Sequence, residues 1–308
     1  MSAIPTSAPA PNRFWRKLKL TLEMIKFEHS IFALPFALTG ALEGWRATPL
    51  TWTEAAWKLL WIVVAMVGAR SAAMTFNRIV DAAIDARNPR TEIRQLPAGT
   101  LTARFAWGFF AAAVAVFLLA AWILGRLCLQ LAPLALGVVL VYSYTKRFTS
   151  WCHVVLGLAL GIAPAAAWIA VTGSLDWNIA WLTAAVMLWT AGFDIIYACQ
   201  DYEFDGREGL FSLPRALGIG GALRVSRLFH IGMMLCLWQF HLAFSRSPLT
   251  LLALAAVAAL LVYEHSLVRA NDLSRVDAAF FTVNGWIGVL FFLFWGSGQF
   301  LAHAATRN

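Results

Sequence analysis

The sequence predicts an all-α, polytopic membrane protein, and three observations lead to that fold class. Hydrophobic residues make up 60% of the 308 residues, charged residues only 13%, and the mean hydropathy is +0.69. A soluble core cannot bury so much apolar surface, whereas helices in a bilayer can. The apolar residues fall into runs of about 20, the length that crosses about 30 Å of hydrocarbon. The basic residues lie in short loops between the runs, so the net charge of +8 does not indicate a nucleic-acid partner.

Nine transmembrane helices are expected, and they would form one domain over residues 20–302. The spans are 20–44, 54–76, 104–125, 127–145, 153–172, 177–199, 222–243, 248–265 and 277–300. Gly125 and Arg126 separate the third span from the fourth, and the polar segment 245–248 separates the seventh from the eighth. Residues 1–19 start polar and Pro-rich and end basic and aromatic, which predicts a disordered cytoplasmic segment that reaches the membrane surface. Residues 303–308 would be a tail.

The distribution of positive charge supports this set of spans. With the N-terminus in the cytoplasm, 17 of the 24 Lys and Arg residues fall in cytoplasmic segments and five on the other side. This bias favours nine helices with the N-terminus inside and the C-terminus outside. No signal peptide is expected, because a basic region, an apolar region and a cleavage site do not follow one another at the start. The four cysteines lie far apart in apolar runs, which indicates neither disulfides nor a cysteine metal site.

The first of two acidic motifs lies at the predicted cytoplasmic end of the second span. Asn77, Asp81 and Asp85 recur every four residues and therefore share one face of a helix. Like charges at this spacing repel, so they cost stability unless a cation lies between them. Acidic residues also solvate helix ends, and this motif alone leaves both interpretations open.

The second motif lies at the end of the sixth span. Asp201 and Asp205 again have a spacing of four, and Asp194 lies two turns earlier on the same side, with Tyr197 on that face. A carboxylate inside a membrane segment is costly, which makes Asp194 a candidate functional residue. Two facing acidic motifs suit Mg²⁺, which takes oxygen ligands and often bridges one or two carboxylates to phosphates. Such a site would stabilise a leaving diphosphate.

Basic residues near both motifs are candidate partners for an anion. Arg70 lies two turns before Asn77, where it would either pair with the acidic motif or bind an anionic substrate. The others are Tyr142, Lys146 and Arg147 at the end of the fourth span, and Arg207 and Arg215 after the second motif. For the basic members, contact with a diphosphate and the ordinary positive-inside excess are both open. The 15 Trp and 22 Phe residues are expected to face lipid for the most part, and some of them to line a tunnel for an isoprenoid chain.

These motifs make nearly the whole chain, from residue 26 to the last helix, resemble the UbiA superfamily of intramembrane prenyltransferases. The resemblance implies nine transmembrane helices and Mg²⁺-dependent transfer of a prenyl group from a diphosphate to an acceptor, often an aromatic ring. The matching residues are Asn77, Asp81 and Asp85 in the first motif, Asp194, Asp201 and Asp205 in the second, Tyr142, Lys146 and Arg147 in the family's Tyr-x-x-x-Lys-Arg segment, and Arg70 before the first motif. The chain departs from the family at Arg78, where a carboxylate is frequent, and this replaces a potential metal ligand with a cation.

The resemblance is greatest to the 4-hydroxybenzoate polyprenyltransferase-like subgroup. It implies transfer of a polyprenyl group to 4-hydroxybenzoate for ubiquinone synthesis, at the cytoplasmic side of a bacterial inner membrane. In this scheme Mg²⁺ is held by Asn77, Asp81, Asp85, Asp201 and Asp205, the diphosphate by Tyr142, Lys146, Arg147 and Arg207, and catalysis involves Asp194, Tyr197 and Arg70. The prenyl chain length, the number of metals and the oligomeric state stay open.

Other functions remain compatible with these patterns. The acceptor could instead be 1,4-dihydroxy-6-naphthoate for menaquinone synthesis, homogentisate or a haem-type ring. A cation-coupled transporter also uses intramembrane acids, but here the acids gather on one side, whereas transporter sites lie near the midplane. A CDP-alcohol phosphotransferase is disfavoured, because no second acidic pair follows Asp205 and Gly206 at the required spacing.

Overall fold

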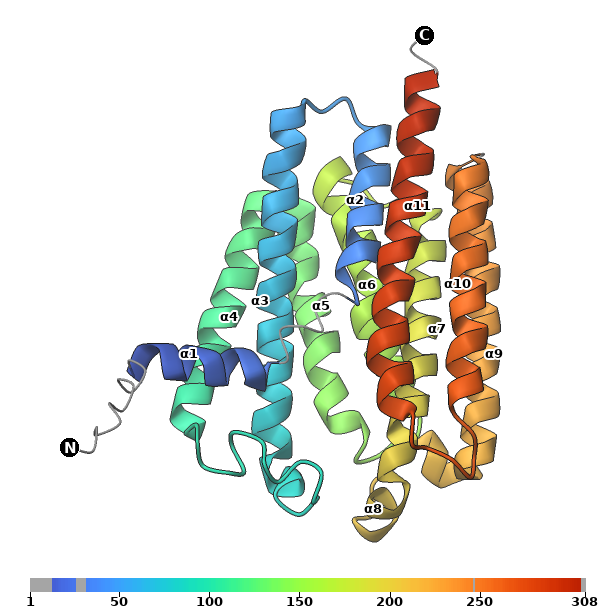
Figure 1. Ribbon diagram of the computed structural model, residues 1–308. Coiled ribbons are helices and arrows are strands. Elements are labelled where there is room, and N and C mark those ends of the chain that lie inside the picture. Colours follow the sequence, from blue (N-terminus) through green and yellow to red (C-terminus); the bar gives the residue numbers. More distant parts are fainter. Residues whose placement is uncertain (1–12, 26–31, 246, 306–308) are drawn as a thin grey trace, which may run out of the picture.

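The structure, a computed structural model, describes residues 13–25, 32–245 and 247–305, and its regular elements in these ranges are helices (Figure 1). The all-α prediction is confirmed for them. Residues 1–12 of the predicted N-terminal segment, the family-like segment 26–31 and residues 306–308 of the predicted tail lie outside the described ranges. Residues 303–305 of that tail belong to α11, so the prediction of a tail is wrong for them. The four cysteines are free thiols, as expected.

Most of the chain forms long helices that run up and down beside one another (Figure 1). They are α2 (Leu34–Ala47), α3 (Trp52–Asp85), α4 (Ala103–Leu124), α5 (Arg126–Thr145), α6 (Cys152–Thr172), α7 (Ile179–Ala198), α9 (Leu213–Phe244), α10 (Pro248–Leu267) and α11 (Asn284–Ala305). The shorter elements are α1 (Arg13–Met24), the 3-10 turn η2 (Cys199–Asp201), α8 (Tyr202–Arg207) and the π-helical turn η3 (Ala278–Val283). The loop 86–102 and α8 lie at the same end of the bundle.

The first predicted span, 20–44, is wrong at its start. Residues 20–24 belong to α1, which lies crosswise to the long helices (Figure 1). The next described helix, α2, begins only at Leu34, with Pro35 in its first turn. Proline suits that position, because its missing N–H group would have no partner inside the helix anyway. The basic, aromatic residues 13–19 therefore belong to a separate helix, α1, so the prediction of a disordered segment is wrong for them.

Seven helices among the described residues are long and apolar enough to cross a membrane, which establishes a multi-pass membrane protein. The predicted number of nine is not confirmed, because α2 and α9 fall outside this group. The 14 residues of α2 extend only about 21 Å. Helix α9 carries Arg215, Arg224 and Arg227 in its first half and is kinked at Gly218, where φ is 69°.

The two helix boundaries at Gly125 and at residues 245–248 are where the sequence predicted them. Helix α4 ends at Leu124 and α5 begins at Arg126, because Gly125 adopts a φ of 137° that breaks the helical backbone. Helix α9 ends at Phe244, and Ser247 caps α10 by accepting a hydrogen bond from the Leu249 N–H. Both divisions thus follow from local residue chemistry.

The bundle is held together by an aromatic core and by close helix contacts. Trp189, Phe240, Phe291 and Trp295 are fully buried between α2, α7, α9, α10 and α11. Many other tryptophans are exposed, such as Trp177 at 82%, as expected for lipid-facing or interfacial residues. On α6, a Cβ at Gly157 would clash with the Met187 carbonyl of α7, and one at Gly161 would lie 2.8 Å from the Thr183 carbonyl oxygen. Small residues of this kind let two helix backbones approach each other.

Candidate active site

The first acidic motif has the predicted helical geometry. Asn77, Asp81 and Asp85 all lie on the last turns of α3, which ends at Asp85. The Asn77 Nδ2 donates a hydrogen bond to Asp81 Oδ2 at 2.8 Å. Arg147, just after α5, donates from Nη2 to Asp81 Oδ1 at 3.1 Å and to the Val80 carbonyl at 2.8 Å. A basic residue of the predicted diphosphate group therefore lies directly on the first motif.

The second motif differs from the predicted helical face. Asp194 lies in α7, but α7 ends at Ala198, and Asp201 closes the 3-10 turn before α8 begins. Asp205 lies in α8 and is fully buried. A tighter turn with three residues per repeat rotates the following side chains away from the α-helical positions. Asp194 and the pair Asp201 and Asp205 are thus presented from three consecutive elements, and one continuous α-helix does not carry them.

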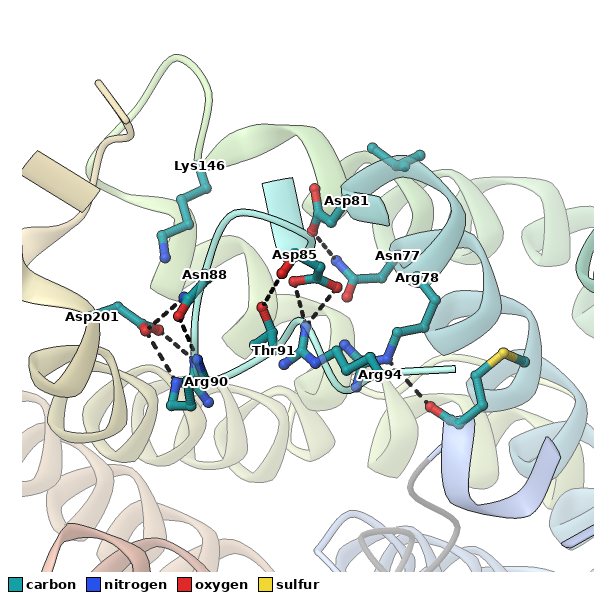
Figure 2. Close-up of polar contacts among 12 residues, drawn as sticks. Asn77, Arg78, Asp81, Asp85, Asn88, Arg90, Thr91, Arg94, Lys146 and Asp201 are labelled. Carbon is teal, nitrogen blue, oxygen red and sulfur yellow. Dashed lines mark hydrogen bonds and ion pairs between the residues drawn. The ribbon is translucent and has the colours of Figure 1, made fainter. Parts of the chain in front are cut away.

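The loop 86–102 connects the two motifs (Figure 2). Arg94 places its Nη1 2.7 and 2.8 Å from the two oxygens of Asp85, at the end of α3. Arg90 binds Asp201 with two nitrogens, Nε at 3.1 Å and Nη2 at 2.6 Å. Asn88 also donates to Asp201, at 3.3 Å. The two motifs therefore lie at one site, since a single short loop contacts both.

Lys146 completes the set of cations around the motifs. Its Nζ lies 2.7 Å from Oδ1 of the buried Asp205. Burial lowers the pKa of Lys146, but the Asp205 and Asp201 carboxylates outweigh burial and raise that pKa above its usual value. The lysine therefore keeps its charge at neutral pH. Its carbonyl also accepts a hydrogen bond from the Phe211 N–H at 2.8 Å, which joins the end of α5 to the loop before α9.

His153 is a site residue that the sequence patterns missed. It is buried in the first turn of α6, and its Nδ1 lies 2.7 Å from Oδ2 of Asp194. The Leu213 N–H at the start of α9 approaches the His153 Nε2 at 3.4 Å. An Nε2 that accepts this bond leaves Nδ1 to donate to Asp194. The two partners are 41 residues apart, so their spacing carries no motif.

Tyr197 and Tyr142 lie on the membrane side of the motifs. Arg90 donates from Nη1 to the Tyr197 hydroxyl at 3.1 Å, and the guanidinium lies over the Tyr197 ring. The Tyr197 ring packs on Phe280 of η3, with centroids 4.2 Å apart. Tyr142 lies on α5, one turn before Lys146. An aromatic wall therefore adjoins the charged groups.

Two of the basic residues lie away from the motifs, and a third lies further along α3. Arg78 points to α1, where its Nε approaches the Met24 carbonyl at 3.4 Å, so it links two helices and does not take a ligand position (Figure 2). Arg207 is exposed on α8, and no hydrogen bond or ion pair joins its side chain to another described residue. Arg70 is partly buried in α3, two turns before Asn77, as expected.

The carboxylates suit a cation that shares its ligands with a substrate. Within the described residues, no three His, Cys, Asp or Glu side chains come close enough to hold a metal ion on their own. Mg²⁺ does not need such a cage, because it usually retains waters and binds one or two carboxylates together with substrate phosphates. The oxygen donors of Asn77, Asp81, Asp85 and Asp201 fit that mode of binding.

Comparisons with known proteins agree with this geometry. Residues 33–298 match the model of the UbiA prenyltransferase family. A 4-hydroxybenzoate octaprenyltransferase of Tolumonas auensis is 33% identical over 227 residues, which cover 72% of this chain and 77% of that protein. A 4-hydroxybenzoate octaprenyltransferase of Vibrio campbellii is 28% identical over 289 residues, covering 92% and 96%.

Solved structures share the fold. A UbiA homolog from Aeropyrum pernix K1 superimposes with a TM-score of 0.78 at 32% identity and covers 90% of this chain and 98% of its own. A UbiA homolog from Archaeoglobus fulgidus, bound to DMAPP and Mg²⁺, superimposes with a TM-score of 0.71 over the same fractions. Its identity of 21% makes that second likeness one of fold alone.

Proposed function

Because the chain belongs to the UbiA prenyltransferase family, we propose that it transfers a polyprenyl group from a polyprenyl diphosphate to the ring of 4-hydroxybenzoate. The observation that carries this proposal is the loop 86–102, which brings the two acidic motifs to one site. The names of its relatives from Tolumonas auensis and Vibrio campbellii support the acceptor. The reaction would serve ubiquinone synthesis.

The acidic motifs would hold the diphosphate through Mg²⁺. The A. fulgidus homolog binds DMAPP together with Mg²⁺, which supports this use of the metal. The proposed ligands are Asn77, Asp81, Asp85, Asp201 and Asp205. The metal supplies positive charge that stabilises the leaving diphosphate. Lys146 and Arg147 would neutralise further phosphate charge, because both already lie on the carboxylates of the motifs.

The remaining proposed diphosphate contacts are Tyr142 and Arg207. Tyr142 lies one turn before Lys146 on α5, from where its hydroxyl would donate to a phosphate oxygen. Arg207 would contribute least, because its side chain is exposed on α8. The bond between the prenyl carbon and the diphosphate oxygen breaks with both electrons going to oxygen, which leaves an allylic cation. The aromatic wall of Tyr197 and Phe280 would stabilise that cation and exclude water.

Asp194 would orient the acceptor. It lies deeper in the bundle than the metal motifs, and His153 holds one of its two carboxylate oxygens. The free oxygen would accept the hydrogen bond of the acceptor hydroxyl, which raises the electron density of the ring as its carbon attacks the prenyl cation. The ring then loses a proton. Arg70 would bind the carboxylate of 4-hydroxybenzoate, since it lies further along the same face of α3.

The proposed location is a bacterial inner membrane, with the N-terminus and the active site on the cytoplasmic side. The single transmembrane domain over 20–302 is part of the same proposal. The charge bias of the loops supports this orientation, because the site lies at the end of the bundle that carries the basic loop 86–102.

A prenyl-transfer assay in membranes tests the proposal. Membranes that contain the protein would receive labelled polyprenyl diphosphate, Mg²⁺ and either 4-hydroxybenzoate or 1,4-dihydroxy-6-naphthoate. We expect a lipid-soluble product with 4-hydroxybenzoate that disappears with EDTA and in an Asp81→Ala/Asp201→Ala variant. A product with the naphthoate alone would show that the naphthoate, and not 4-hydroxybenzoate, is the acceptor. If neither acceptor gave a product that depends on Mg²⁺ and on the two acids, the transferase proposal would fail.

A further inference from the structure

A chain of buried polar side chains crosses the aromatic core, and the proposed mechanism does not use it. Trp189 of α7 donates from Nε1 to Asn284 Oδ1 at 2.7 Å, and Asn284 donates from Nδ2 to Oε1 of Glu264 on α10 at 2.9 Å. All three side chains are fully buried. Ionisable and polar groups inside a membrane bundle are costly, and they often mark functional positions. The place of this chain in the fold therefore indicates what it contributes.

Asn284 also binds the backbone at the point where α11 begins. Its Nδ2 lies 3.1 Å from the Ala279 carbonyl oxygen and 3.2 Å from the Phe280 carbonyl oxygen. Both carbonyls belong to the π-helical turn η3, which ends at Val283, immediately before α11. Where a π turn meets an α-helix the backbone bonding pattern changes, and side chains in membrane bundles bond the carbonyls freed there. The Asn284 amide therefore stabilises η3 as a π turn.

The orientation of the Asn284 amide is determined by its partners. The indole N–H of Trp189 can only donate, so the amide atom that it contacts is the oxygen. The amide nitrogen then faces Glu264 and the two η3 carbonyls, whose oxygens all accept its hydrogen bonds. The reverse orientation would place the amide oxygen against these acceptors. Trp189 and Glu264 thus hold the amide in the orientation that serves η3.

The turn that Asn284 stabilises carries part of the aromatic wall at the proposed reaction centre. Phe280 of η3 packs on the Tyr197 ring, with centroids 4.2 Å apart, and on the Phe193 ring at 5.2 Å. Trp189, Phe193 and Tyr197 recur every four residues on α7 and share one face of that helix. Phe280 therefore contacts the part of this row that leads to the acidic motifs, and Asn284 contacts the other end.

A change of η3 from π to α geometry would move the Phe280 ring. The π turn contains one residue more per repeat than an α-helical turn, and one residue of register in an α-helix is a rotation of about 100°. Without the Asn284 donor, η3 would relax toward α-helical geometry. The Phe280 ring would then turn away from Tyr197.

We propose that Asn284, oriented by Trp189 and Glu264, is a positioning residue that holds Phe280 against Tyr197 through the π turn. The inference rests on the proposed function, in which this aromatic wall stabilises the allylic cation and excludes water. When Phe280 is displaced, water reaches the cation. The water oxygen bonds to the cationic carbon and a proton is released, which gives prenyl alcohol in place of the prenylated ring. Asn284 thereby determines which nucleophile captures the cation.

The ratio of prenyl alcohol to prenylated acceptor tests this role. The purified full chain, reconstituted in lipid vesicles, would receive labelled octaprenyl diphosphate, Mg²⁺ and 4-hydroxybenzoate. The variants are Asn284→Ala, Phe280→Ala and the double variant. Thermal unfolding identifies any variant that fails to fold. Trp189→Phe then replaces Asn284→Ala, because it keeps a buried ring and removes only the donor that orients the amide.

The matched control is Thr250→Val at the other end of α10. Thr250 is fully buried and bonds to His241 of α9 at 2.8 Å. Its replacement removes a buried hydrogen bond between helices but does not touch η3. Thr250→Val should therefore lower the unfolding temperature and keep the wild-type product ratio.

The positioning role predicts a change in the products rather than in diphosphate binding. The share of prenyl alcohol should rise about tenfold in Asn284→Ala and in Phe280→Ala, with the KM for the diphosphate unchanged. The double variant should show no further rise, because both changes remove the same ring from Tyr197. A wild-type ratio in the folded Asn284 or Trp189 variant, or a further rise in the double variant, would overturn the positioning role and leave the proposed function standing. Wild-type protein that gives no Mg²⁺-dependent product would overturn both.

Discussion

Two buried acidic sites lie at opposite ends of the bundle, and their partners differ in kind. At one end, Glu43 of α2 is only 2% exposed and accepts hydrogen bonds from Trp295 Nε1 and Gln299 Nε2, both at 2.7 Å. Arg46, one turn along the same helix, donates to its other oxygen at 2.8 Å. At the other end, Asp85 is paired with Arg94 from a loop.

The comparison separates a carboxylate held by helix-borne donors from carboxylates held by residues of a loop. The partners of Glu43 are carried by α2 and α11, and two of the three are neutral donors that a metal cannot replace. Helix-borne donors have fixed positions, so this carboxylate holds two helices together. The partners of Asp85 and Asp201 are flexible side chains on a loop. The proposed function requires these carboxylates to accept a metal, and partners on a loop can move away without unfolding a helix.

The largest expected effect is at the acidic motifs. Asp81→Asn and Asp201→Asn should each lower the rate of prenyl transfer on the order of 10²–10³-fold, because each removes charge that stabilises the leaving diphosphate. Their thermal stability should stay near that of the wild type. Initial rates with labelled polyprenyl diphosphate and saturating Mg²⁺ measure the effect. Full activity in both variants would remove the motifs from the mechanism.

In contrast to the aspartate variants, Glu43→Ala should lower the stability of the protein and leave its Mg²⁺ dependence nearly unchanged. Loss of the carboxylate leaves Arg46, Trp295 and Gln299 without their shared acceptor, and breaking such a buried group costs about 3–5 kcal/mol. We expect a clear drop in the unfolding temperature in detergent, with near-normal Mg²⁺ dependence in the protein that stays folded. Glu43→Gln is the matched control, since it retains an acceptor. A changed Mg²⁺ requirement would contradict the structural assignment.

A smaller effect is expected at His153. His153→Leu removes the group that holds Asp194, so kcat should fall about tenfold through misorientation of the acceptor, with the KM for polyprenyl diphosphate unchanged. His153→Gln keeps a donor within reach of Asp194 and should restore most of kcat. Steady-state kinetics with each substrate varied separately distinguish these outcomes. Equal losses in both variants would assign His153 a packing role only.

Arg207→Ala should have the smallest effect. The side chain is exposed, and exposed charges contribute less than about 1 kcal/mol to an interaction, which corresponds to a KM for the diphosphate raised less than about fivefold. Lys146→Ala is the comparison, because Lys146 lies 2.7 Å from the buried Asp205. The elevated pKa of Lys146 also predicts that diphosphate binding does not weaken as the pH rises from 7 to 9. Equal KM values for Lys146→Ala and Arg207→Ala would contradict this ranking.

Patterns within one element were predictable from the sequence. The all-α class and the helical face of Asn77, Asp81 and Asp85 are confirmed, because composition and periodicity determine single helices. The prenyltransferase family is also confirmed, because its motifs are short runs of neighbouring residues. The separation of α4 from α5 at Gly125 is confirmed for the same local reason. The side chains of Asn77 and Asp81 form a hydrogen bond, as residues four apart on a helix can.

Contacts between distant elements were not predictable. The pairing of His153 with Asp194 joins α6 to α7, and neither residue marks the other in the sequence. Arg90 and Arg94 looked like ordinary positive-inside residues until the loop brought them to the motifs. The end of α1 was predicted as part of the first span, because the apolar face of α1 continues the apolar pattern of that span.

The close contact between α6 and α7 has a consequence for which substitutions the site can accept. Gly157 begins the second turn of α6, four residues after His153, and it lies directly against the α7 backbone that leads to Asp194. A Cβ there would clash with the Met187 carbonyl, so we expect any side chain at 157 to push the two helices apart. Backbone packing thereby constrains a position that carries no chemistry of its own. Variation along α6 should avoid 157 and 161 even where the chemistry of the acceptor changes.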